Sequence, residues 1–103
     1  MEKGVALVLY VAEKRRHDGR LLYEWLIEKA RDTGLPGGSA LRAIEGFGRH
    51  GLHHERFFEL AGDLPVVLHF VSTPALAERF LALLAAEKLD LFVVRYEVEF
   101  GVV

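Results

Sequence analysis

The residues best suited to binding chemistry lie together in the run Glu45-Gly46-Phe47-Gly48-Arg49-His50. Glycine on either side of an aromatic residue lets backbone N–H groups approach a ligand closely. Arg49 then supplies a planar cation whose paired N–H donors suit a phosphate. The run therefore predicts a loop that holds an anionic group, while a β-bulge or turn would use the same glycines. The glycine motifs of P-loop and dinucleotide-binding proteins are absent from the sequence.

Histidines form the second group, in the polar connection that follows: His50, His53 and His54, with Glu55 beside them. Imidazole is a common ligand of zinc, copper and nickel, and in a trimer three copies of the group could meet on the symmetry axis. The spacing matches no established closed metal site, and a solvated polar loop accounts for the same residues. His69 lies within an apolar segment and is interpreted as a hydrogen-bonded interface residue.

The charged run from Glu13 to Asp18 is interpreted as a solvated loop. The functional alternative is that Arg15 or Arg16 closes over an anion held at the glycine-rich run. Trp25 falls near the apolar stripe of the following helix and is expected to pack in the core.

Composition limits the classes of protein that the chain can represent. Its 103 residues make one domain, residues 1–103, and 13 basic against 15 acidic side chains give a net charge of -2, which disfavours nucleic acid as a partner. The apolar run from Val5 to Ala12 is too short to span a membrane, and no signal peptide is expected. The absence of Cys fits a reducing cytoplasm. The lack of Asn and Gln fits a thermophilic source, and equally a GC-rich genome.

Hydrophobic periodicity predicts six elements. Apolar runs and strict alternation predict strands, and an i, i+3, i+4, i+7 pattern predicts helices. The first helix is expected to have Asp18 as N-cap and Gly34 at its end, and the second to start at the Thr73-Pro74 pair. The predicted elements are strands at 5–12, 39–47, 64–71 and 91–100, and helices at about 21–33 and 74–88.

The order βαββαβ predicts a ferredoxin-like α+β sandwich, in which two helices cover one face of a four-stranded antiparallel sheet. Such a sheet should alternate apolar and polar residues. The first strand does not alternate, and in the third strand Val67, His69 and Val71 leave one polar residue on the second face. Exposed apolar patches of this kind mark interfaces, so we expect an oligomer that buries the second face.

Catalysis is not expected. Acylphosphatases have this size and topology, but their chemistry needs a side-chain amide, which the sequence lacks. The two serines, Ser39 and Ser72, lie in no nucleophile-elbow sequence. Glu97 and Glu99 share one face of a strand, and this pair of carboxylates is interpreted as part of a solvent-exposed face rather than as a catalytic pair. The residues therefore predict a binding protein rather than an enzyme.

The glycine-rich run also carries a family resemblance. Residues 46–55 resemble the start of the T-loop in PII nitrogen-regulatory signalling proteins. Residues 41–48, Leu-Arg-Ala-Ile-Glu-Gly-Phe-Gly, resemble a small PII-like branch catalogued as a domain of unknown function. Glu13, Leu22-Tyr23 and residues 64–67 extend the likeness over nearly the whole chain.

This resemblance implies a cytoplasmic homotrimer that binds an adenine nucleotide (ATP, ADP or AMP) as an effector between subunits, with no cofactor required. The loop at 49–63 would signal to an unknown regulated protein. The implied ligand-binding positions are Gly46, Phe47, Gly48 and Arg49, with Arg42 and Glu45 in the same motif and Lys88 and Arg95 as substitutes by position.

Three departures from the PII pattern stand out. Residues 87–90, Glu-Lys-Leu-Asp, replace the Gly-Asp-Gly-Lys segment that grips phosphate in PII proteins, and no Arg-rich tail follows the last strand. The connection is short and has no tyrosine to modify. The alternative is a trimer resembling the divalent-cation tolerance proteins, which would bind metal through His50, His53 and His54.

Overall fold

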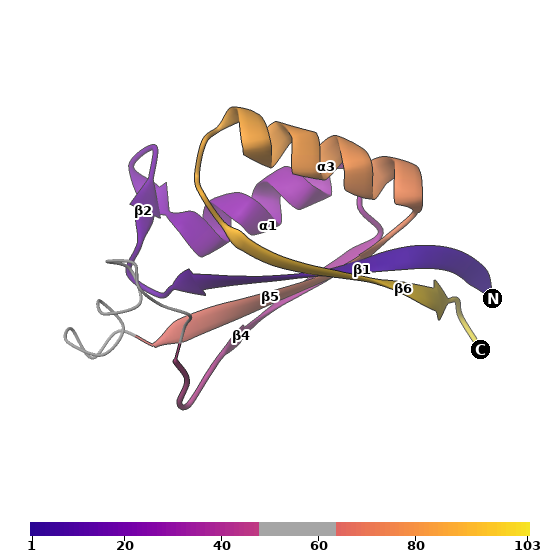
Figure 1. Ribbon diagram of the computed structural model, residues 1–103, viewed down its shortest axis with the longest axis horizontal. Helices are drawn as coiled ribbons and strands as arrows, with labels where there is room; N and C mark the ends of the chain where they lie inside the picture. Colours follow the sequence, from indigo (N-terminus) through magenta and orange to yellow (C-terminus); the bar gives the residue numbers. More distant parts are fainter. Residues whose placement is uncertain (48–63) are drawn as a thin grey trace.

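The computed structural model describes residues 1–47 and 64–103. The chain forms one sandwich of helices and strands (Figure 1). Its elements, in chain order, are β1 (Glu2–Ala12), β2 (Arg16–His17), β3 (Arg20–Leu21), α1 (Leu22–Thr33), β4 (Gly37–Arg42), β5 (Pro65–Ser72), α3 (Pro74–Ala86) and β6 (Phe92–Phe100).

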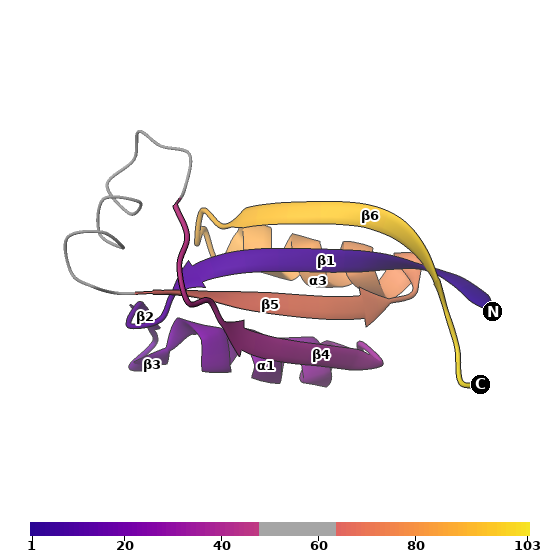
Figure 2. The same ribbon diagram turned by 90° about the horizontal axis from the view of Figure 1, so that it is seen from below.

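The main sheet has the order β4-β5-β1-β6, and all of its neighbouring strands are antiparallel. Both α1 and α3 lie against one face of this sheet (Figure 2). The predicted ferredoxin-like arrangement is therefore confirmed, with β1 and β5 as the central strands. A short hairpin of β2 and β3 is added between β1 and α1. Within the described ranges, no helix has the length and hydrophobicity needed to cross a bilayer.

The core lies between the sheet and the two helices. Alternate residues of β1 and β5 point into it, as the pleat of a strand requires. Phe70 of β5 and Phe80 of α3 meet edge to face with their ring centroids 5.4 Å apart. Trp25 is 3% exposed, which confirms its expected packing role. The largest fully buried side chains are Phe70, Phe80, Leu7, Leu9, Leu22, Leu26, Leu68 and Val11.

The observed helix ends agree only in part with those predicted from the sequence. The Thr73 hydroxyl accepts a hydrogen bond from the Leu76 N–H at 3.3 Å, and Gly34 ends α1 in the left-handed conformation with φ 104°, so both of these predictions are confirmed. The prediction for Asp18 is wrong, because the N-cap position of α1 is Leu21. Asp18 instead adopts φ 50° in the turn between β2 and β3. Helix α3 ends at Ala86, two residues before the expected Lys88.

The second main strand is shorter than the predicted 39–47. After Arg42 one more backbone hydrogen bond forms, from the Ala43 N–H to the Pro65 carbonyl at 2.9 Å. Pro65 has no N–H to continue the ladder. The Leu64 carbonyl accepts a hydrogen bond from the Glu13 N–H at 3.0 Å instead. The ladder therefore ends here, and residues 43–47 are irregular.

The sheet face away from the helices is largely apolar, and we call it the open face. It holds alternate residues of β1, β4, β5 and β6, placed on one side by the strand register. Tyr10 is 40% exposed, Phe92 51%, Tyr96 46% and Leu41 56%. The larger side chains of the open face are Tyr10, Leu41, Val67, His69, Val71, Phe92, Val94, Tyr96 and Val98, and the smaller Ala6, Val8 and Ser39 lie between them. The second apolar face expected from the sequence is therefore present.

Candidate functional site

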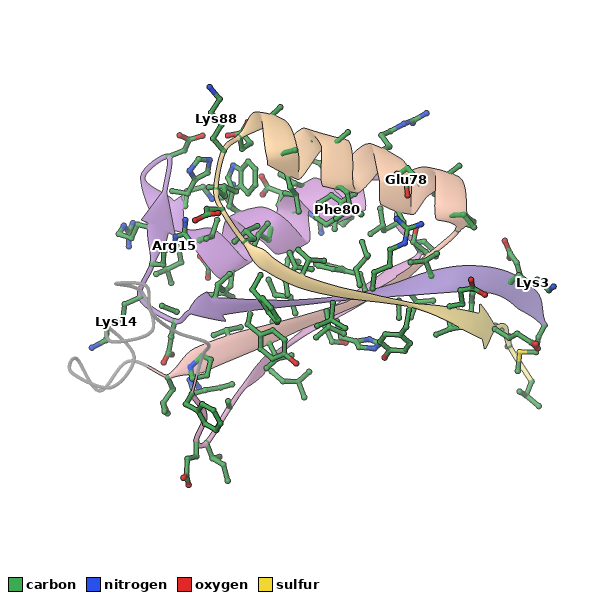
Figure 3. All side chains as sticks on the ribbon, in the orientation of Figure 1. Lys3, Lys14, Arg15, Glu78, Phe80 and Lys88 are labelled. Carbon is green, nitrogen blue, oxygen red and sulfur yellow. The ribbon has the colours of Figure 1, made fainter. Side chains whose placement is uncertain are left out.

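Three segments lie toward the same end of the sandwich, which we call the loop end (Figure 1). They are residues 13–19 after β1, residues 43–47 after β4, and residues 87–90 after α3. Figure 3 shows Arg15 and Lys88 at this end, and Glu78 and Lys3 toward the opposite end. The loop end thus collects cationic side chains from segments that are far apart in the sequence.

Arg42 is tied to Glu13 at the loop end. The Arg42 Nε donates to a Glu13 carboxylate oxygen at 2.8 Å, and a terminal guanidinium nitrogen donates to the same oxygen. This hydrogen bond lowers the pKa of Glu13 below its ordinary value and raises that of Arg42. Arg42 remains exposed, so its guanidinium stands at the point where the chain leaves β4.

Arg15 joins the segment after β1 to the turn after α3. A terminal nitrogen of its guanidinium donates to the Leu89 carbonyl at 2.6 Å. Partial burial lowers the pKa of Arg15, while the nearby Asp90 carboxylate acts in the opposite direction. Arg16 donates to the Gly19 carbonyl at 2.7 Å. Arg15 therefore holds the turn that carries Lys88, and the charged run is a structured hairpin rather than a loop only.

The described part of the glycine-rich run is exposed. Glu45, Gly46 and Phe47 lie outside any strand or helix, and Phe47 is 89% exposed. A side chain added at Gly46 would lie 3.4 Å from the Pro65 ring. Phe47 therefore does not pack against the described part of its own chain, and residues 44–47 are all exposed.

The remaining sequence candidates are not gathered at the loop end. Arg95 pairs with Leu7 in the middle of β1 and donates to Glu78 of α3. It also lines a shallow hollow with two further acidic residues, Glu97 and Glu99, and with Lys3, so this hollow has no surplus of positive charge. The other candidates lie outside the described residues: Gly48, Arg49, His50, His53 and His54.

One cluster at the loop end was not found from the sequence. His17 Nε2 lies 2.9 Å from a Glu87 carboxylate oxygen and 3.5 Å from an Asp18 carboxylate oxygen. Glu87 is 70 positions away in the chain, and no local motif connects the two segments. The His17-Asp18 pair was the only local signal of the cluster.

Comparison with known proteins places the chain in a family. The model of the DUF190 family, described as an uncharacterized ACR, matches residues 4–100. The chain belongs to the DUF190 family. A UPF0166 protein of Aquifex aeolicus is 32% identical to this DUF190 chain over 80 residues, which are 77% of the chain and 76% of that protein. A UPF0166 protein of Methanocaldococcus jannaschii is 28% identical over 71 residues, 69% of the chain and 66% of that protein.

Solved structures share the fold of this DUF190 chain. CPII of Thiomonas intermedia, bound to ADP, AMP and acetate, has a TM-score of 0.69 at 12% identity, covering 97% of this chain and 90% of that one. A putative PII-like signaling protein of Thermus thermophilus has a TM-score of 0.53 at 24% identity, covering 95% and 89%. The expected membership of a domain-of-unknown-function family is confirmed by the family match, and the likeness to the PII-like structures concerns the fold.

Proposed function

We propose that this DUF190 chain is a PII-like regulatory protein that binds a small anionic effector, an adenine nucleotide, at the loop end. The observation that carries the proposal is the position of Arg42. It stands exposed where β4 passes into the Gly46-Phe47 segment, at the same end as Lys88. A planar guanidinium followed closely in the chain by an exposed glycine-rich segment is suited to a phosphate.

The proposed effector is supported by the shared fold. CPII of Thiomonas intermedia was crystallised with ADP and AMP. In our proposal Arg42 and Arg49 contact phosphate, Gly46 and Gly48 supply backbone donors, and Glu45 and Phe47 shape the segment. Lys88 lies at the same end of the sandwich on the helix side, where it adds positive charge. Arg95 has no part in it, because Glu78 pairs with it away from the loop end.

Assembly is the second part of the proposal. The open face is apolar over four strands, and both helices lie on the opposite face (Figure 2). Apolar surface of this extent is stabilised when another subunit covers it. We therefore propose a homotrimer whose subunits pack through their open faces and whose effector sites lie where loop ends meet neighbouring subunits.

Signalling follows from where the effector would bind. The proposed site adjoins residues 49–63, so bound nucleotide would favour one arrangement of that connection over others. A partner protein that recognises that arrangement would respond to the effector. In this proposal the chain performs no catalytic step.

Calorimetric titration with ATP, ADP and AMP tests the proposal. We expect binding by the wild type and at least about tenfold weaker affinity in Arg42→Ala and in Arg49→Ala, because each variant removes a charge-assisted contact worth about 1.5–3 kcal/mol. Glu13→Gln breaks the Glu13–Arg42 ion pair but keeps the guanidinium, so it shows whether loss of that pair alone weakens binding. Arg95→Ala is the matched control away from the loop end. No binding of any nucleotide by the wild type, or equal affinity in all variants, contradicts the proposal.

A thermal-shift screen separates the nucleotide proposal from the metal alternative. Stabilisation by an adenine nucleotide supports the former, because a ligand that binds the native state raises its unfolding temperature. Stabilisation by zinc or copper that is lost when His50, His53 and His54 are replaced by Ala supports the alternative.

A further inference from the structure

His17, Asp18 and Glu87 form a cluster of metal-ligating side chains that the nucleotide proposal does not use. Their ligand atoms all lie within 4.8 Å of one another. His17 and Asp18 come from the β2–β3 hairpin, and Glu87 caps the C-terminal end of α3. Two segments of the fold thus present one imidazole and two carboxylates to a single point.

The charge of this cluster favours a cation. Both carboxylates lie within ion-pair distance of His17 Nε2. The two nearby arginines are engaged elsewhere, since Arg15 donates to the Leu89 carbonyl and Arg16 to the Gly19 carbonyl. A neutral imidazole has one N–H and can donate it to one carboxylate at a time. The two carboxylates together carry two negative charges, which suits a divalent cation.

Two of the three separations between the ligand atoms are close to those around a small divalent ion, and the third is within 4.8 Å. Zinc binds imidazole nitrogen at about 2.0–2.1 Å and carboxylate oxygen at about 2.0–2.2 Å in tetrahedral geometry. Two ligands of such an ion lie about 3.3 Å apart. The two separations from His17 Nε2, 2.9 Å and 3.5 Å, lie on either side of this value.

His17 is also held in place. Its ring contacts Trp25 edge to face with the centroids 4.7 Å apart, and its side chain is 18% exposed. The two carboxylates are more open, at 69% for Asp18 and 37% for Glu87. An ion can therefore reach the cluster from solvent and keep water in its remaining coordination position.

We propose that His17, Asp18 and Glu87 bind a divalent transition-metal ion, Zn²⁺, at the loop end. The bound ion would join the β2–β3 hairpin to the turn after α3 and so fix the turn that carries Lys88. This site goes beyond the proposed nucleotide binding and uses none of His50, His53 and His54.

Calorimetric titration with Zn²⁺ alone, in competition with a chelator of known affinity, tests this site. Asp18→Asn and Glu87→Gln keep the shape of each side chain but remove its charge, and Asn tolerates the positive φ of position 18. Loss of an outer-shell partner already weakens metal binding by about 10–100-fold, so loss of a direct ligand should cost at least as much. We expect this loss in both variants and in His17→Ala.

Two controls locate the metal. Glu78→Gln changes a carboxylate near the opposite end of α3 and should leave the Zn²⁺ affinity unchanged. Replacement of His50, His53 and His54 by Ala should retain one Zn²⁺ per chain. Co²⁺ as a spectroscopic substitute should show a visible absorption band in this triple variant that His17→Ala removes.

Three results would overturn the site. They are no Zn²⁺ binding by the wild type, unchanged affinity in both Asp18→Asn and Glu87→Gln, or complete loss of binding in the triple histidine variant. The near-isosteric variants keep the test decisive if His17→Ala fails to fold. Because Zn²⁺ is titrated without nucleotide, this outcome is independent of the nucleotide titrations.

Discussion

His69 and Tyr96 meet across the open face, although a whole strand separates them. His69 Nε2 lies 3.3 Å from the Tyr96 hydroxyl. His69 belongs to β5 and Tyr96 to β6, with β1 between them. The side chains of β1 beneath this contact are the small Ala6 and Val8. The expected hydrogen bond of His69 is thus confirmed, and this polar pair would remain satisfied if the surrounding apolar face were buried.

The open face predicts the effect of a charge at Val94, which lies opposite Val8 in the register and is 36% exposed. Val94→Asp should shift the assembly to monomers, because a carboxylate buried in an apolar interface without a partner is strongly unfavourable. Sedimentation velocity at micromolar concentration measures the change.

Val94→Leu is the matched control for this experiment. It keeps the position apolar, and it should sediment as the wild type does. A monomeric wild type at the same concentration contradicts the proposed assembly, and an unchanged oligomer in Val94→Asp shows that the interface lies elsewhere.

The pairing of Glu13 with Arg42 predicts a pH dependence of stability. The Arg42 hydrogen bond lowers the folded-state pKa of Glu13, so the native state binds protons less readily than the unfolded chain does. The pair therefore stabilises fully above the unfolded pKa of about 4.3, and this contribution is lost as pH falls through the lower folded value. Glu13→Gln should unfold at a lower temperature than the wild type at pH 7.

The difference in unfolding temperature between these two proteins should shrink as pH falls below about 4, which thermal unfolding over a pH series would measure. Glu45→Gln is the control, since it changes an exposed carboxylate nearby without breaking this pair. A difference that is constant from pH 7 to pH 3 contradicts the role of the pair.

The element order and the core could be predicted from the sequence because they depend on periodicity. Val66, Leu68 and Phe70 alternate with Val67, His69 and Val71, and the structure places the two sets on opposite faces. The roles of Thr73 and Gly34 at helix ends could be predicted because capping depends on residues that are close in the sequence. The apolar open face was found for the same reason, since alternation within one strand reports its two faces.

The features that the sequence did not reveal depend on partners distant in the chain. Strand β4 ends at Arg42 because Pro65 has no N–H and the Leu64 carbonyl bonds to Glu13, and the sequence around Phe47 holds no sign of this. The cluster of His17 with Glu87 likewise forms only when the hairpin meets the end of α3. Asp18 has the residue type of an N-cap, but the hairpin of β2 and β3 uses it as a turn residue.

The N-cap of α3 gives a second stability prediction. Thr73→Ala removes the acceptor for the Leu76 N–H and should lower the free energy of unfolding by about 1 kcal/mol. Thr73→Ser keeps the hydroxyl and should retain most of the stability. Urea unfolding at one fixed protein concentration measures both, and equal losses in the two variants would contradict a capping role.

Two glycines of the sheet predict opposite effects for the same substitution. A Cβ at Gly4 would lie 2.6 Å from the Ser72 carbonyl oxygen, which belongs to the paired backbone of β5, whereas a Cβ at Gly37 meets nothing within 4 Å. Gly4→Ala must therefore push β1 and β5 apart and should lower the free energy of unfolding by about 1–3 kcal/mol. Gly37→Ala should leave it unchanged or raise it by about 0.4–1 kcal/mol, because alanine restricts the unfolded chain. Urea unfolding of the pair at one protein concentration measures this contrast, and equal effects would show that the two strands do not approach each other so closely at Gly4.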